Sequence, residues 1–162
     1  MNRFSWTALC LLLLALPGAG LAQGAQVAFG DRQQDSDLPV EVTSQNLDVN
    51  QDDGTAVFTG NVVVGQGEMR LFAPRVLVVY KEDESGIDRL EATGGVIVIS
   101  GEDAAEGDKA DYFVDTGMIE MEGSVLLVQP RQTLTSDKMV VDTRDGTAQM
   151  TGRVKTILQP QD

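Results

Sequence analysis

Apolar and polar residues alternate with a period of two along most of the chain, and the alternation is clearest around four regularly spaced glycines. These are Gly60, Gly94, Gly123 and Gly152, which follow one another after 34, 29 and 29 residues. The segments around them, AVFTGNVVV, LEATGGVIV, IEMEGSVLL and AQMTGRVKT, carry apolar residues two and four positions before the glycine and a valine two positions after it. A period of two predicts half-buried β-strands. Each glycine falls on the predicted buried side, where it predicts a kink in its strand.

A second alternating segment precedes each of these strands. The four segments are SQNLDV, APRVLV, GDKADY and SDKMVV, beginning at Ser44, Ala73, Gly107 and Ser136. The connections QDDG, KEDESG, DTG and RDG join each segment to the glycine-containing strand that follows it. Asp-Gly pairs and nearby glycines between alternating segments are strong signals of β-hairpins. Four strand-turn-strand units are therefore predicted to cover residues 40–158.

A repeat of this kind buries its apolar face by stacking one unit on the next. No segment carries a convincing amphipathic helix, so we expect an all-β fold, a jelly roll or solenoid of repeated antiparallel strand pairs with open ends. The first strand, Val40–Val42, and the last, Arg153–Leu158, lack a neighbour in the repeat and should expose unpaired backbone groups. This predicts head-to-tail joining of copies, which prolines at Lys155 and Ile157 are expected to prevent.

Both ends of the chain differ from this pattern. Residues 1–22 combine Arg3, the apolar run ALCLLLLAL and a break at Pro17 ahead of small residues, which predicts a signal peptide cleaved after Ala22. A membrane anchor is the alternative, but the run has about half of the roughly 20 residues that span a bilayer. Residues 23–39 are polar and predict a flexible leader, and residues 159–162 a polar tail.

Composition removes several classes of function. The chain has no histidine, and its single cysteine, Cys10, lies in the predicted signal peptide. Ser-His-Asp and Cys-His catalysis and most zinc sites are thereby excluded, and we expect no cofactor. The formal net charge of −13 becomes −14 without Arg3, which disfavours binding to nucleic acid or to anionic membrane surfaces.

Two long segments carry a resemblance to a known family. LDVNQDDGTAVFTGNVVVGQG and GDKADYFVDTGMIEMEGSVLLVQ, behind a predicted signal peptide, resemble the periplasmic lipopolysaccharide transport protein A family, the OstA-like β-jelly roll. The similarity covers about residues 40–158. The box FTGNVVVGQG, residues 58–67, is fairly specific to this family. The last unit departs from the box, because Arg153 stands at the position of the asparagine.

The resemblance implies a periplasmic protein with a twisted, V-shaped stack of antiparallel strands whose apolar interior holds the lipid A acyl chains of lipopolysaccharide. It also implies head-to-tail joining between transport components of the inner and outer membranes, so that lipopolysaccharide passes along one connected groove to the outer membrane. Small inward residues such as Ala56 and Ala92 are compatible with either a solid core or such a groove. The residues expected to line the groove are Val40, Val42, Leu47, Val49, Phe58, Val62, Val64, Leu71, Val76, Val78, Val96, Val98, Tyr112, Met121, Val125, Leu127 and Met139.

Other interpretations of the sequence stay open. The chain is compatible with a structural β-solenoid that polymerises without a lipid, or with a partner component of the same fold. A carbohydrate-active enzyme would need a carboxylate pair, such as Asp108 with Asp111 or Glu102 with Asp103. The outward basic residues that could meet lipid phosphates are Arg75, Lys109, Lys138 and Arg153, although such residues are usually solvated.

Overall fold

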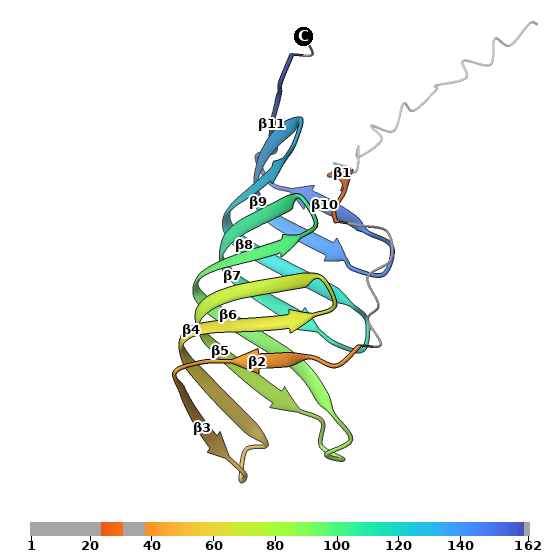
Figure 1. Cartoon of the computed structure of the whole chain (residues 1–162). Helices are drawn as coiled ribbons and strands as arrows, with labels where there is room; N and C mark the ends of the chain where they lie inside the picture. Colours follow the sequence, from red (N-terminus) through yellow and green to blue (C-terminus); the bar gives the residue numbers. More distant parts are fainter. Residues whose placement is uncertain (1–23, 31–37, 161–162) are drawn as a thin grey trace, which may run out of the picture.

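The computed structural model describes residues 24–30 and 38–160, which form eleven β-strands and no helix (Figure 1). The predicted all-β fold is confirmed, whereas the predicted signal peptide lies outside the described residues. No helix long and apolar enough to cross a membrane occurs in the described ranges. The strands are β1 (Ala25–Ala28), β2 (Glu41–Thr43), β3 (Asn46–Asn50), β4 (Thr55–Gln66), β5 (Met69–Tyr80), β6 (Ile87–Ser100), β7 (Asp103–Phe113), β8 (Met118–Gln129), β9 (Gln132–Asp142), β10 (Thr147–Thr151) and β11 (Lys155–Leu158).

All strands belong to one antiparallel sheet that does not close. Its order is β1-β10-β9-β8-β7-β6-β5-β4-β2, with β3 also on β4 and β11 also on β9. Successive long strands therefore stack as hairpins along one axis, with β2 and β3 at one end and β1, β10 and β11 at the other (Figure 1). This is the predicted jelly roll of repeated antiparallel strand pairs with open ends.

Gly60, Gly94 and Gly123 lie in β-bulges that bend their strands, and Gly152 lies in the bend between β10 and β11. Thr59 pairs with Arg75 and Val62 with Ala73. The two residues Gly60 and Asn61 therefore lie opposite the single residue Pro74 of β5. Both bulge residues have positive φ, 83° at Gly60 and 47° at Asn61. Glycine adopts such angles without steric cost and asparagine tolerates them. The predicted kink is thus confirmed.

The predicted buried position of these glycines is wrong. Gly94 and Gly152 are exposed, and a Cβ added at Gly123 would meet the side chain of Asp108, which is itself exposed. An added Cβ at Gly152 would similarly meet Asp137. Two consecutive positive φ angles turn the backbone away from the alternation of a flat strand, so the glycines lie at the outer side of each bend.

The bends divide the sheet into two layers. The first layer contains β3, β10 and β1 with the halves of the long strands that pair with them, and the second contains β2 and β11 with the other halves. Alternate residues of both layers face inward and form one apolar core. The predicted period of two therefore places the core correctly.

The prediction of a flexible leader over residues 23–39 is wrong for residues 25–29. Residues Ala25–Ala28 form β1, which pairs antiparallel with β10, and Phe29 is buried in the core. At the other end of the chain, Gln159 and Pro160 lie outside any strand. Residues 161 and 162 of the expected tail lie outside the described ranges.

Candidate functional site

The residues predicted to line the groove do lie on the inner faces of the two layers, but most of them are packed against one another. The following side chains are no more than 1% exposed: Val62, Val64, Leu71, Val76, Val78, Val96, Val98, Tyr112, Met121, Val125, Leu127 and Met139. Val40, Val42 and Phe58 are partly buried against this core. In this structure the interior is a filled core, so an acyl chain can enter only if the two layers separate.

Leu47 and Val49 depart from this pattern because they lie on the terminal strand β3. Leu47 pairs with Phe58 and Val49 with Ala56, so both side chains share the inner face of the first layer. They are nevertheless 53% and 62% exposed, since no further strand of the described chain covers them. The N-terminal end of the apolar interior is therefore open to solvent.

Several buried inward residues are absent from the predicted groove lining, although the alternation had already placed three of them, Leu90, Ile119 and Met150, on the buried side. Leu90, Ile119 and Met150 are fully buried on the first layer, and Leu134 is buried on the second. Their signal was the period of two that also identified their neighbours. Phe29 had only the short alternation of AQVAF within a polar segment, so its burial could not be recognised from the sequence.

One buried polar contact bridges the two layers. The Tyr112 hydroxyl, on the first layer, donates a hydrogen bond to Oε1 of Gln66, on the second layer. The Gln66 side-chain amide in turn donates to the carbonyl of Leu38 at 2.8 Å. Burial raises the pKa of Tyr112 above its ordinary value, so its hydroxyl stays protonated and available as a donor. This bridge lies toward the hairpin ends, away from the glycine bulges, and holds the layers together.

Replacing Tyr112 with phenylalanine is expected to weaken this closure. The change keeps the ring and removes the donor, so we expect a loss of about 1–2 kcal/mol in the free energy of unfolding, measured by urea denaturation. Tyr80→Phe is the matched control, because Tyr80 is 41% exposed and should tolerate the change. Equal stability of the two variants would show that the bridge contributes nothing.

The basic residues on the outer face of the first layer meet carboxylates of the same layer. Lys109 lies 2.8 Å from Glu122, and Lys138 contacts Glu120 at 2.7 Å and Glu122 at 3.4 Å. The hydrogen bond from Lys109 is the main cause that lowers the pKa of Glu122. Arg153 similarly pairs with Asp137. Three of the four basic residues considered for lipid phosphates are thus engaged in ion pairs.

The carboxylates of the enzymatic alternative also lie outside the apolar interior. Asp108 lies at an outer bulge, and Asp111 faces outward, where desolvation and then the charge of Glu91 raise its pKa. The Asp103 carboxylate accepts hydrogen bonds from the Gly30 amide and from Gln129, so it has a structural role. Among the described residues, no group of three or more carboxylate or other ligating side chains could hold a metal ion.

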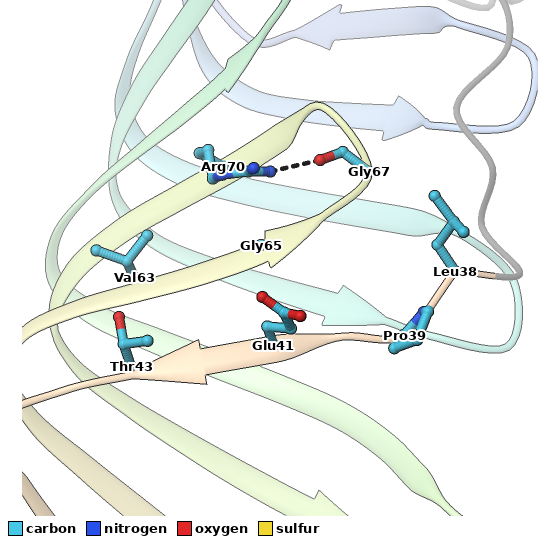
Figure 2. A pocket seen from close by; sticks show the side chains of 8 residues that line it. All are labelled: Leu38, Pro39, Glu41, Thr43, Val63, Gly65, Gly67 and Arg70. Carbon is cyan, nitrogen blue, oxygen red and sulfur yellow. Dashed lines mark hydrogen bonds between the residues drawn. The ribbon is translucent and has the colours of Figure 1, made fainter.

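A hollow with both polar and apolar lining residues lies beside the open end but on the outer surface. Figure 2 shows it between β2 and the β4–β5 hairpin, with Glu41 and Arg70 among its lining residues. It encloses about 410 Å³, and the Arg70 guanidinium donates a 2.6 Å hydrogen bond to the carbonyl of Gly67 at its rim. Because Val63 and Thr43 line it with their outward side chains, this hollow is separate from the apolar interior.

Three comparisons relate this architecture to known proteins. Residues 41–147 match the family described as "LptA/(LptD N-terminal domain) LPS transport protein". The lipopolysaccharide export system protein LptH of Pseudomonas aeruginosa is 28% identical over 138 residues, which cover 78% of this chain and 75% of LptH. An uncharacterized protein of Rhizobium meliloti is 29% identical over 157 residues, which cover 90% of this chain and 84% of that protein.

The fold likeness extends to a solved structure. The crystal structure of LptH, the LptA homologous periplasmic component of the lipopolysaccharide transport device of Pseudomonas aeruginosa, superposes with a TM-score of 0.70. The alignment covers 79% of this chain and all of the LptH chain at 20% sequence identity. At that identity the superposition establishes a common fold.

Proposed function

The chain belongs to the LptA/(LptD N-terminal domain) family of LPS transport proteins, and on that premise we propose that it carries lipopolysaccharide across the periplasm by holding the acyl chains between its two layers. The observation that carries this proposal is the continuous inner column of aliphatic side chains, which opens to solvent at Leu47 and Val49. An acyl chain would enter at this end of the core once the two layers separate.

The free energy of transfer supports a carrier of this kind. Each methylene group moved from water into an apolar environment gains about 0.8 kcal/mol, so a chain of about twelve carbons gains on the order of 10 kcal/mol before entropy losses. Lipid of this kind cannot cross an aqueous compartment freely. The inner faces of the two layers offer a matching apolar surface, and no Asp, Glu, Lys or Arg side chain is buried among the described residues.

Opening the layers is the conformational change that the proposal requires. The bulges connect the layers along one side, while the Tyr112–Gln66 contact joins them toward the hairpin ends. Small rotations at successive bulges would widen the space between the layers without breaking the hydrogen bonds between neighbouring strands. We infer that the acyl chains replace the side-chain contacts of the filled core.

We propose the periplasm as the location and components of the same fold at the inner and outer membranes as the partners. The apolar run of residues 8–16 supports export through a signal peptide cleaved after Ala22. The open sheet ends support head-to-tail joining, because an edge strand offers unpaired backbone groups to another chain.

Mass spectrometry of lipids that copurify with the protein tests the proposal. We expect lipid A or intact lipopolysaccharide in protein purified from the periplasm of a Gram-negative host. Protein that carries no lipid, and takes up none when mixed with lipopolysaccharide, would contradict the carrier function. That result would favour the alternative of a structural β-solenoid with a solid core.

A further inference from the structure

Strand β1 covers a sheet edge that would otherwise be free. Within the first layer, β10 is the last strand of the repeat, and β1 pairs with it through Ala25–Met150, Gln26–Gln149, Val27–Ala148 and Ala28–Thr147. In the second layer, the described residues contain no strand beyond β11. The two layers therefore end differently: one terminal edge is covered by the beginning of the same chain and the other is not.

Few contacts hold β1 in this position. The Phe29 amide donates to the carbonyl of Gly146 at 2.9 Å, and the Gln129 side-chain amide donates to the carbonyl of Ala28 at 2.7 Å. The Gly30 amide donates to the Asp103 carboxylate at 2.8 Å. Only Phe29 is fully buried in this segment, since Ala25 and Val27 are half-buried. A strand of four residues with small side chains is a weak cover for the edge.

The repeat shows which position β1 occupies. Ala148 and Met150 precede Gly152 by four and two residues, as Ala56 and Phe58 precede Gly60. In the first unit, Ala56 pairs with Val78 and Phe58 with Val76 of the following strand, β5. In the last unit, Ala148 pairs with Val27 and Met150 with Ala25 of β1. Strand β1 thus takes the place of the next strand that the repeat would supply.

Strand β3 of a second copy fits the same place. Leu47 and Val49 occupy the positions in their segment that Val76 and Val78 occupy in theirs. Strand directions alternate along the layer from β3 to β10, so β3 of a copy stacked in the same orientation would run antiparallel to β10, as β1 does. Its Leu47 would lie opposite Met150 and its Val49 opposite Ala148.

We propose that β1 is a temporary cover of the β10 edge and that β3 of a second copy replaces it when two molecules join head to tail. This inference rests on the proposed function only in its use of head-to-tail joining. The exchange substitutes leucine for Ala25 and valine for Val27, and it buries two side chains that are more than half exposed in the single molecule. The gain in buried apolar area drives the displacement.

A disulfide that locks β1 in place provides the first test. The Phe29 amide bonds to Gly146, so hydrogen-bonded pairs recur at every second residue of the β1–β10 ladder. Gln26–Gln149 is therefore a non-hydrogen-bonded pair, whose Cα atoms lie close enough for a disulfide. The test uses the full-length chain with Cys10→Ala, to which Gln26→Cys and Gln149→Cys are added. This double-cysteine variant should stay monomeric when oxidised, and when reduced it should assemble as its concentration rises. Each single-cysteine variant under the same oxidant is the control. Assembly of the locked chain at the level of the reduced chain would overturn the inference.

A disulfide between two copies tests the proposed register. Asp48 lies between Leu47 and Val49 and would face Gln149 of the neighbouring copy. A chain with Asp48→Cys, mixed with one that carries Gln149→Cys, should form a mixed disulfide well above the background given by Asp52→Cys in the adjacent turn. No excess over this background would overturn the register and with it the proposal.

Weakening β1 should increase this crosslinking. Val27→Pro removes an amide that faces β10, whereas the amide of Gln26 faces away, so Gln26→Pro is the matched control. We expect about a fivefold gain in the mixed disulfide for Val27→Pro over Gln26→Pro. Equal yields would show that β1 does not compete for the edge. Binding of labelled lipopolysaccharide to the wild type and to each variant, measured in parallel, separates the test of the proposed function from the test of strand exchange. Absence of binding in all of them would contradict the proposed function and leave the strand-exchange result intact.

Discussion

Replacing Gly123 with valine is expected to lower the free energy of unfolding by at least about 3 kcal/mol. Gly123 has a φ of +86°, which costs a β-branched residue about 1–3 kcal/mol in backbone strain. The new Cβ would also clash with Asp108 Oδ2 and lie 2.7 Å from Asp108 Cβ, so the facing part of strand β7 would have to move. Both costs arise at the bend that connects the two layers.

Urea denaturation of Gly123→Val beside Gly86→Val measures this effect. Gly86 lies in a hairpin turn, without positive φ and with open space around an added Cβ, so valine there should change stability little. Unfolding of Gly123→Val at the wild-type urea concentration would contradict the role assigned to the bulge. A large loss confined to Gly123→Val is the expected result.

Proline at both Thr156 and Leu158 is expected to abolish concentration-dependent assembly while leaving the single molecule folded. The Gln159 amide donates to the Arg131 carbonyl at 3.0 Å, so in the alternating ladder the amides of Lys155 and Ile157 also face β9. The amides of Thr156 and Leu158 then face the free edge. Proline there removes the donors that an incoming β2 would need.

The sequence-based choice of prolines at Lys155 and Ile157 was therefore wrong by one residue. Those substitutions remove bonds within the β9–β11 pair and are expected to lower stability, which makes them the matched control for the edge variant. Light scattering against concentration measures assembly, and transfer of lipopolysaccharide between membrane vesicles measures transport. Full transfer by a strictly monomeric Thr156→Pro, Leu158→Pro variant would contradict the bridge.

Alternation was sufficient to predict which side chains of the long strands face inward. Val62, Val96 and Val125 follow their glycines by two residues and are all buried, because a bulge of two residues against one leaves the period of two intact on either side. The direction of the glycines themselves was not predictable, since it depends on φ angles at two successive residues. Local pattern therefore identified the core but not the geometry of the bends.

The ends of the sheet were the least predictable part of the fold. Leu47 carries the same alternation as Val76, yet one is exposed and the other buried, because only Val76 has strands on both sides. The pairing of β1 with β10 joins residues at opposite ends of the chain. A pattern read along the sequence contains no information about such a distant partner, so strand β1 could not be predicted within the polar leader.

Photo-crosslinking in living cells tests the central claim, that lipopolysaccharide travels between the two layers, most directly. A photoreactive amino acid at Val62 or Met121 points into the interior, whereas one at Thr59 or Glu122 points out of the same strands. We expect adducts with lipopolysaccharide at the two inward positions and none at the two outward positions, because neighbouring strand residues face opposite sides. Equal labelling of both sets, or adducts at the outward positions alone, would contradict transport through the interior.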